Sequence, residues 1–351
     1  MPDGKRLDQN LCWEIGIVRQ MKHGEAICGD TATVKRSRDR VQLVLADGLG
    51  SGIQAAIAST LTSALVSQLT EAGFPVGESL CAVEKVLPVT RKHNLAYSTF
   101  TLVSAEGREV RLVQYDNPPA VFMRDGVPLA YPMASYEFGE KTVLESGLTM
   151  KSGDMLILFS DGISEAGRGV TTYAGWDRRE MEDYLSRNIG PDDGARRVAA
   201  EVVSAAQALD LYEFHDDTTV AVLRLRERLT VNLRIGAADG SLPTEKEARC
   251  GSPAQENVSV TCSPETIRET ISLLERYLQD GMMSLGAGQE QDEASKLLTM
   301  LTEQASDVNL VLCAAAPEPE QEKKESDVVE LTLRLRKLLE EAGKSVTLGF
   351  C

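Results

Sequence analysis

Short apolar runs recur through the first 226 residues, and turn residues separate them. Runs of this length, rich in Val, Ile, Leu and Phe, are typical of buried β-strands. The strands predicted in this way cover residues 13–18, 41–46, 99–104, 109–115, 120–123, 155–160 and 220–225. Hairpin loops are predicted at 105–108 and 124–127, and the second contains the Asp-Gly pair that tight turns prefer. The series favours largely antiparallel sheet over a doubly wound parallel sheet.

Two stretches of the same region have apolar residues at every third or fourth position, which predicts helices. The first covers 53–69, Gly73 can end it, and its apolar face consists of Ile53, Ala56, Ile57, Leu61, Ala64, Leu65 and Leu69. The second covers 195–209, and its apolar face consists of Val198, Val202, Ala206 and Leu209. We expect both faces to pack against the core.

The character of the sequence changes after Arg226, so that we expect a first domain over 1–229. Residues 230–257 are predicted to be a linker or irregular segment, because Gly, Ala, Ser, Glu and Pro are frequent there. Residues 258–351 are predicted to form a small acidic α/β domain. Its helices are expected at 263–281, 290–305 and 328–341, and its strands at 308–313 and 346–350. Its role stays open between binding a partner, sensing a ligand and forming a homodimer contact.

Composition excludes several classes of protein. A net charge of -16 at pH 7 argues against non-specific binding to nucleic acid or to an anionic membrane. No apolar run approaches the roughly 18 residues that span a bilayer, and the first residues lack the apolar core of a signal peptide. The seven cysteines contain no Cys-x-x-Cys pair, so neither a zinc site nor a disulfide framework is indicated. We therefore expect a cytoplasmic, reduced protein without nucleic-acid or membrane partners.

Acidic residues stand at the ends of four predicted strands. Asp47 and Asp161 each follow an apolar run and precede a glycine, Asp30 follows Gly29, and the pair 216–217 precedes another run. Carboxylates are costly to bury unpaired, whereas Mg²⁺ and Mn²⁺ prefer carboxylate and carbonyl oxygens. A glycine after a ligand lets the chain turn sharply and leaves the backbone carbonyl free to approach a metal. The pattern therefore predicts a shared divalent-cation site.

These acidic sites belong to a longer, ordered set of motifs that covers most of 10–226. The motifs are Gly29-Asp30, Ala46-Asp-Gly-Leu-Gly-Ser-Gly52, Ser98-Thr-Phe100, Tyr115-Asp-Asn-Pro-Pro-Ala120, Phe159-Ser-Asp-Gly-Ile-Ser-Glu-Ala166 and Asp216-Asp-Thr-Thr-Val220. In this order they resemble the metal-dependent PP2C-type (PPM) serine/threonine phosphatases, in their bacterial SpoIIE-like branch. The resemblance implies an α+β fold, a four-layer α-β-β-α sandwich of two antiparallel sheets.

The resemblance also implies two divalent metal ions, Mn²⁺ or Mg²⁺, and roles for the matching residues. Asp47 would bridge both ions, and the carbonyl of Gly48 would bind one of them. Asp161 and Asp216 would ligate the other ion. The nucleophile of the family is a metal-bridging hydroxide, so no protein nucleophile is expected.

Several residues beside these ligands also receive assignments. Asp30 would bind an ion directly or through a water, and Asp217 occupies the position next to a ligand. His215 and Glu165 are expected to be structural rather than to act as an acid or to orient a water. Cys28 is expected to be a buried apolar thiol rather than a redox group.

Two further features distinguish the sequence within the resemblance. Ser51 is expected to be the N-cap of the 53–69 helix rather than part of a phosphate-cradling loop. The early arginine that grips substrate phosphate in many eukaryotic relatives has no clear counterpart. Arg19, Lys22 and the basic run Lys35, Arg36, Arg38 and Arg40 are the candidates to replace it.

The expected function is that of a protein serine/threonine phosphatase acting on a bacterial signalling regulator. In this branch the usual substrate is an anti-sigma-factor antagonist of the STAS type, an assignment that rests on analogy. One alternative is a non-catalytic interaction protein that keeps the fold and binds such a regulator. Retention of all four strand-end sites argues against it. The other alternative is a phosphohydrolase that acts on a small molecule.

Overall fold

The computed structural model describes residues 11–36, 40–86, 98–138, 141–236, 256–280, 293–305, 307–313, 322–342 and 344–350. The chain forms two compact units, Met1–Arg226 and Glu227–Cys351. Each unit has a hydrophobic core of its own.

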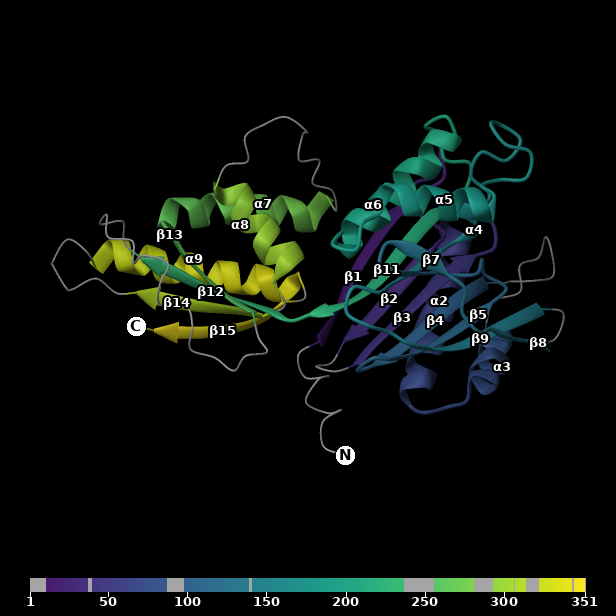
Figure 1. Cartoon of the computed structure of the whole chain (residues 1–351), viewed down its shortest axis with the longest axis horizontal. Coiled ribbons are helices and arrows are strands. Elements are labelled where there is room, and N and C mark those ends of the chain that lie inside the picture. Colours follow the sequence, from purple (N-terminus) through teal and green to yellow (C-terminus); the bar gives the residue numbers. More distant parts are fainter. Residues whose placement is uncertain are drawn as a thin grey trace. The chain divides into compact units, whose positions relative to one another are not determined.

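The first unit contains two β-sheets with helices on their outer faces (Figure 1). Its strands are β1 (Leu11–Gln20), β2 (Thr31–Arg36), β3 (Arg40–Gly48), β4 (Ser98–Glu106), β5 (Glu109–Tyr115), β6 (Val121–Arg124), β7 (Val127–Leu129), β8 (Ala134–Phe138), β9 (Lys141–Thr149), β10 (Met155–Phe159) and β11 (Thr218–Glu227). Its helices are α2 (Gly52–Glu71), α3 (Val76–Val86), α4 (Asp161–Ser164), α5 (Arg178–Asn188) and α6 (Ala195–Leu209). One sheet has the order β1-β11-β10-β6-β7, and the other has the order β2-β3-β4-β5-β9-β8.

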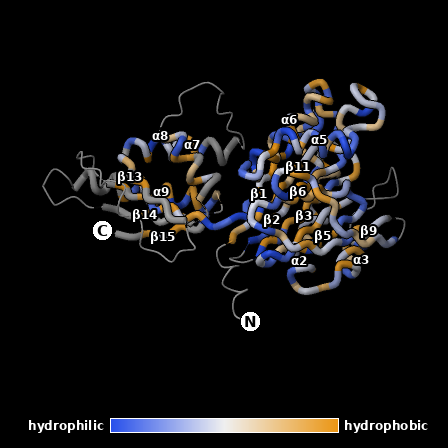
Figure 2. Tube along the Cα trace, in the orientation of Figure 1, coloured by the Kyte–Doolittle hydropathy of each residue, from blue (hydrophilic) through white to orange (hydrophobic). Residues whose placement is uncertain are grey.

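Alternation along the central strands divides the core of this unit into three layers. In β3, Leu43 and Leu45 share a cluster with Leu156 of β10, between the two sheets. Val44 belongs to the cluster with α2 and α3, whereas Ile157 of β10 belongs to the cluster with α5 and α6. Both faces of these strands are therefore buried, which explains their continuous apolar runs (Figure 2). The predicted α+β four-layer sandwich of two antiparallel sheets is confirmed.

The helix predicted over 195–209 is α6, and its predicted core face is the one that packs. Val198, Val202 and Ala206 are fully buried in the layer between α5, α6 and their sheet. The predicted hairpin at 124–127 joins β6 to β7. Asp125 and Gly126 both have a positive φ there, as the tight turn requires.

The prediction for the core face of α2 is wrong. Ile53, Ile57 and Leu61 are 64%, 49% and 37% exposed. The side of α2 that packs on the sheet carries small and hydroxyl residues instead: Ala55, Ala58, Ser59, Thr62, Ser63, Val66 and Ser67. The hydroxyls of Ser59, Ser63 and Ser67 form hydrogen bonds with polar side chains of the sheet, as between Ser67 and Gln42 at 2.7 Å. Small residues allow α2 to pack closely on the sheet. The prediction from hydrophobic periodicity therefore chose the opposite face of this helix.

The second unit is a parallel sheet with helices. Its elements are β12 (Leu229–Gly236), β13 (Glu256–Cys262), α7 (Pro264–Asp280), α8 (Glu293–Thr299), the π-helical turn η1 (Met300–Gln304), β14 (Asp307–Cys313), α9 (Glu322–Glu341) and β15 (Ser345–Phe350). The strands are ordered β13-β12-β14-β15, and all three neighbouring pairs are parallel. One face of β12 and β14 is buried against the three helices.

The prediction of an irregular segment over 230–257 is wrong at both ends of that range, because β12 begins at Leu229 and β13 begins at Glu256. Val231, Leu233 and Ile235 alternate with polar residues and are fully buried, a period-two signal that marks a half-buried strand. Residues 237–255 lie outside the described part of the chain.

The longest helices that the structure describes, α2 and α9, have 20 residues each. Helix α2 contains Ser, Thr and Gln throughout, and α9 is rich in charged residues. Within the described ranges, no helix combines the length and the hydropathy that a membrane span needs.

Candidate metal and catalytic site

Five aspartates stand where strands of both sheets end. Asp30 immediately precedes β2, and Asp47 is the penultimate residue of β3. Because Thr31 pairs with Ala46, these two carboxylates come from neighbouring positions of one sheet. Asp161 follows β10 as the first residue of α4, and the pair 216–217 precedes the adjacent strand β11. The fold thus gives each predicted ligand a place at a strand end.

The pKa values of these carboxylates show that the two sheets bring them together. Burial raises the pKa of Asp30 to about 6, and the charges of Asp217 and Asp161 add to the effect. Burial raises the pKa of Asp47 to about 10, with contributions from Asp30, Asp161 and Asp216. Burial, followed by other acidic neighbours, also raises the pKa of Asp161 and of Asp216. The cluster is therefore a concentration of buried negative charge, which the nearby cation of Lys22 offsets only in part.

Unsatisfied buried oxygens test whether a metal ion fits this cluster. Asp30 is 1% exposed, and neither of its carboxylate oxygens has a hydrogen-bond partner. Oδ2 of Asp217 is likewise buried without a partner. Among the described residues no three acidic, His or Cys side chains already converge on one point. Mg²⁺ and similar ions keep several waters and need only one or two carboxylates, so the donor set fits hard divalent cations.

Glycines in the two Asp-Gly pairs are needed for close packing. A Cβ on Gly48 would lie 2.1 Å from the carbonyl oxygen of Ala55, in the first turns of α2. A Cβ on Gly162 would lie 2.3 Å from the carbonyl oxygen of Asp217. Neither glycine has a positive φ, so the sharp turn expected from the sequence is not what selects glycine here. Instead, the missing side chain lets the backbone of Ala55 approach Gly48 and the backbone of Asp217 approach Gly162.

Three contacts around the carboxylates were not predicted from the sequence. The hydroxyl of Ser98 donates to the carbonyl of Asp47 over 2.7 Å. The backbone N–H of Thr219 donates to Oγ of Ser160 over 2.9 Å, which ties the start of β11 to the residue before Asp161. The backbone N–H of Lys22 donates to Oδ1 of Asp217 over 3.0 Å. Ser98 belongs to a matched motif, but nothing in its local pattern indicates this partner.

Ser51 stands at the N-cap position of α2, with the extended backbone that a cap requires. Its side chain does not cap the helix, so the prediction of a capping serine is wrong in this respect. Its hydroxyl instead donates to Oε1 of Glu25 over 2.7 Å. Glu25 thereby places a carboxylate near the positive end of α2, where helices favour negative charge. The contact joins the β1–β2 loop to the start of α2.

Other neighbours of the cluster have partners outside it. His215 is 59% exposed, and its Nδ1 lies 3.5 Å from Oδ1 of Asp210. Glu165 forms an exposed ion pair of 2.6 Å with Arg168. Burial raises the pKa of Cys28 to about 12, which keeps the thiol protonated at neutral pH.

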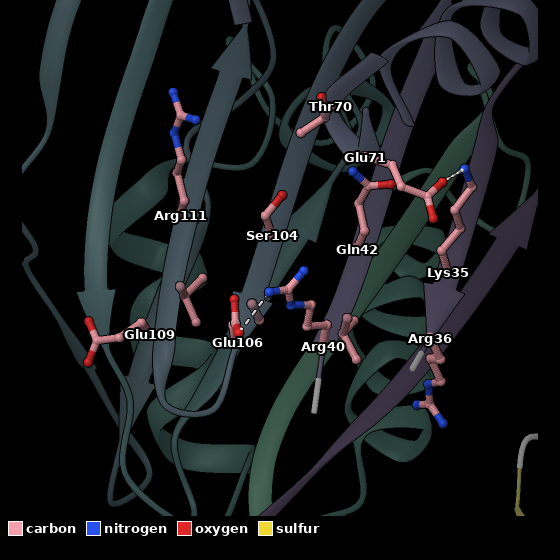
Figure 3. A pocket seen from close by; sticks show the side chains of 13 residues that line it. Lys35, Arg36, Arg40, Gln42, Thr70, Glu71, Ser104, Glu106, Glu109 and Arg111 are labelled. Carbon is pink, nitrogen blue, oxygen red and sulfur yellow. Dashed lines mark hydrogen bonds and ion pairs between the residues drawn. The ribbon is translucent and has the colours of Figure 1, made fainter. Parts of the chain in front are cut away.

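The basic run in β2 and β3 lies at a separate cavity of about 570 Å³ (Figure 3). Lys35 pairs with Glu71 at 2.5 Å, and Arg40 pairs with Glu106 at 3.0 Å. Arg40 begins β3 and Asp47 nearly ends it, so about 24 Å of strand separates them. These cations are therefore not at the acidic cluster. Arg38 lies outside the described residues.

Two other cations lie beside the aspartates. Nη1 of Arg19 donates to the backbone carbonyl of Asp30 over 3.2 Å. The ammonium group of Lys22 lies close enough to Asp216 to lower its pKa, although burial and Asp161 raise that pKa more strongly. Lys22 is thus a basic side chain that reaches the carboxylates.

Comparison with known proteins gives one family match. Residues 37–226 match the family described as Stage II sporulation protein E (SpoIIE). The matched segment contains the aspartates from Asp47 onward, whereas Asp30 precedes it. The segment is more than half of the chain and ends where the first compact unit ends.

Individual proteins resemble the same part of the chain. Stage II sporulation protein E of Priestia megaterium is 24% identical over 221 residues, which are 61% of this chain and 36% of that protein. Phosphoserine phosphatase RsbU of Bacillus subtilis (strain 168) is 22% identical over 234 residues, 63% of this chain and 66% of that protein. The chain thus spans about a third of the first relative. The structure of the PP2C phosphatase domain and a regulatory fragment of Bacillus subtilis SpoIIE has a TM-score of 0.51 and 21% identity, covering 62% of this chain and 64% of that one. This likeness shows a shared fold.

Proposed function

Because the chain belongs to the SpoIIE family, we propose that it is a metal-dependent protein serine/threonine phosphatase. The observation that carries the proposal is the proximity of buried, mutually repelling carboxylates from the strand ends of both sheets. Burial of such charge without a cation is costly, so the arrangement is best explained by bound divalent ions. A protein that only binds a partner would gain nothing from keeping this cost.

The proposed cofactors are two divalent ions, Mn²⁺ or Mg²⁺. The proposed ligands are Asp30, Asp47, the carbonyl of Gly48, Asp161 and Asp216, with Asp217 beside them. When bound, such ions neutralise a phosphoryl group under attack and lower the pKa of a water. Carboxylates from both sheets would together bind the positively charged ions.

Other residues of the chain position these ligands and the substrate. Ser98 fixes the carbonyl of Asp47, and Ser160 fixes the start of β11 next to Asp217. Lys22 offers a cation beside Asp216 and is the proposed contact for the phosphate dianion of the substrate. No side chain of the chain is assigned as nucleophile.

The proposed substrate is phosphoserine or phosphothreonine on a bacterial signalling regulator. The relative RsbU is named a phosphoserine phosphatase, which supports this class of substrate. A small regulator such as a STAS-type anti-sigma-factor antagonist is the specific substrate that we propose. The proposal concerns the first unit, because the family match ends at residue 226.

Hydrolysis assays test the function directly. The full chain should release phosphate from a phosphoserine peptide with Mn²⁺ and should lose this activity with EDTA. Free phosphorylated metabolites should be hydrolysed much more slowly. Faster turnover of a metabolite would point to a small-molecule phosphohydrolase instead. A folded chain that is inactive with every divalent metal would favour a protein that only binds the regulator.

A further inference from the structure

Two consecutive residues after α6 have backbone conformations that side chains rarely adopt. Leu211 has a φ of 53° and Tyr212 has a φ of 69°, both in the left-handed region. Such values are uncommon for residues other than glycine and asparagine, and a bulky side chain makes them unfavourable. Both side chains are nevertheless exposed, Leu211 at 61% and Tyr212 at 74%. The strained backbone therefore holds two apolar side chains out into solvent.

The cause of this conformation is the end of α6. The N–H of Tyr212 donates to the carbonyl of Gln207 over 2.7 Å, and the N–H of Leu211 lies 3.3 Å from the carbonyl of Ala208. Helices that end in this way usually have glycine where Leu211 stands, because glycine adopts the left-handed region without strain. A glycine would close the helix equally well. Packing within the chain thus gives no reason for the two large side chains.

A second loop adds exposed side chains beside the first. Tyr173 is 99% exposed and Val170 is 43% exposed. The N–H of Gly167 donates to Oδ1 of Asp210, and the hydroxyl of Thr171 donates to the carbonyl of Leu209, each over 2.6 Å. These bonds fix the two loops against each other. We call Val170, Tyr173, Leu211 and Tyr212 the rim patch.

The loops that carry the rim patch lead directly to the acidic cluster along the chain. Its first loop follows α4, which begins at Asp161, and its second loop precedes Asp216. Three residues separate Tyr212 from Asp216, and the four steps along the chain span at most about 14 Å. The N–H of His23 also donates to the carbonyl of Phe214, which ties this loop to the loop that carries Lys22. A protein that delivers a phosphorylated side chain to the carboxylates would therefore meet the rim patch.

We propose that the rim patch is the docking surface for the protein part of the phosphorylated substrate. The inference rests on the proposed phosphatase function and adds how a folded phosphoprotein is distinguished from a free phosphate ester. Exposed tyrosine side chains on a rigid support are typical of protein-binding surfaces. A small phosphate ester gains nothing from them. The partner therefore presents an apolar surface next to its phosphorylated residue.

A substitution to glycine separates docking from folding. Tyr212→Gly removes the ring and also relieves the left-handed strain, so the fold should be as stable as before or more stable. We expect kcat/KM for a serine-phosphorylated STAS-domain protein to fall about tenfold or more, mainly through KM. Hydrolysis of p-nitrophenyl phosphate should stay within about twofold of the wild type, because the substitution changes none of the proposed metal ligands and leaves Lys22 in place. Tyr173→Ser should act in the same direction.

Tyr136→Ser is the matched control. Tyr136 is also an exposed tyrosine, at 40%, but it lies on β8, four strands from β3 and therefore about 19 Å away. Tyr136→Ser should leave the turnover of both the phosphoprotein and p-nitrophenyl phosphate unchanged. Unchanged kcat/KM for the phosphoprotein in Tyr212→Gly, with wild-type turnover intact, would overturn the docking surface alone. So would a wild type that prefers the phosphoprotein no more than a short phosphopeptide. Absence of wild-type turnover on every substrate would instead overturn the phosphatase function, and the docking surface with it.

Discussion

The carbonyl oxygen of Ala55 lies only 2.1 Å from the point where a side chain on Gly48 would begin. The end of β3, which carries Asp47, and the first turns of α2 therefore fit together only because residue 48 has no side chain. Ser98, on the neighbouring strand β4, also holds this strand end through the carbonyl of Asp47. The position of one central carboxylate thus depends on contacts that are themselves free of charge.

Substitution of Gly48 by alanine should damage both the fold and the site. The added methyl group forces β3 and α2 apart, at a cost of about 1–3 kcal/mol in the free energy of unfolding. The affinity for Mn²⁺, measured by calorimetry, should fall as well, because Asp47 moves with the strand. Gly77→Ala is the control, since no atom lies within 4 Å of its added Cβ and it stands in α3. Wild-type Mn²⁺ affinity in Gly48→Ala would contradict this reasoning.

Hydropathy suggests that α2 loses more stability from a substitution at an isoleucine than at a serine. The described packing predicts the reverse. Ile57→Ser, at a side chain that is 49% exposed, should change the free energy of unfolding by less than about 0.5 kcal/mol. Ser63→Leu should cost about 1–3 kcal/mol, because Ser63 is fully buried and forms a hydrogen bond with Thr33.

Urea unfolding followed by tryptophan fluorescence measures both variants in the intact chain. The two tryptophans, Trp13 and Trp176, belong to the first unit, so the signal reports that unit. A larger loss of stability in Ile57→Ser than in Ser63→Leu would show that the described packing of α2 is wrong.

Removal of metal should make the stability of the first unit fall as pH rises. In the metal-free chain, burial raises the pKa of Asp30 to about 6 and that of Asp47 to about 10, above the value near 4 of an unfolded chain. The folded state then holds protons that the unfolded state has released, so its advantage is complete below about pH 4 and declines as pH rises. The decline passes through the pKa of Asp30 first and continues toward that of Asp47.

The measurement is the urea midpoint in EDTA between about pH 5 and pH 8, by tryptophan fluorescence. The expected slope is about 1.4 kcal/mol per pH unit for each proton that only the folded state holds, and so about 1–3 kcal/mol per pH unit in this range. Added Mn²⁺ should weaken or reverse the slope, since divalent ions stabilise the ionised carboxylates. A urea midpoint in EDTA that rises with pH would be evidence against buried aspartates that repel one another.

Lys22→Gln should weaken substrate binding. The side chain loses its charge beside Asp216, whereas the backbone bond to Asp217 is kept. We expect KM for p-nitrophenyl phosphate to rise about tenfold, which corresponds to about 1.4 kcal/mol. Lys35→Gln is the matched control, because Lys35 pairs with Glu71 at the separate cavity, where an exposed pair is worth little (Figure 3). Equal effects of the two substitutions would remove Lys22 from the proposed site.

Sequence reasoning succeeded where a single physical signal dominates. The run 41–46 is a strand buried on both faces, and α6 has a strongly apolar stripe against a sheet, so each pattern has one interpretation. It failed for α2, where close packing of Ala, Ser and Thr outweighs hydrophobicity. It also failed at 230–236, where frequent turn residues further along concealed the alternation of β12.

The sequence motifs name the candidate residues of the site. The contacts that hold these residues in place could not be predicted from the sequence. The ordered Asp-Gly motifs name the carboxylates, because acidic residues are poor strand formers and are costly to bury unpaired. Ser98, Ser160 and Glu25 have partners far away in the sequence, which no local pattern reveals. The same holds for the exclusion of Lys35 and Arg40 from the site, since only strand direction and pairing place Arg40 at the other end of β3 and Lys35, on β2, opposite Gln42.

Phosphate release from a phosphoserine peptide, measured against Mn²⁺ concentration, tests the central claim most directly. The wild type should be activated by Mn²⁺ and silenced by EDTA, and Asp47→Asn should lose at least about two orders of magnitude in kcat, since it removes charge that holds the ions. Asp125→Asn is the control, because this exposed turn residue has a positive φ that asparagine also tolerates. Mn²⁺-dependent turnover that survives in Asp47→Asn, or a wild type whose turnover is indifferent to EDTA, would contradict the account.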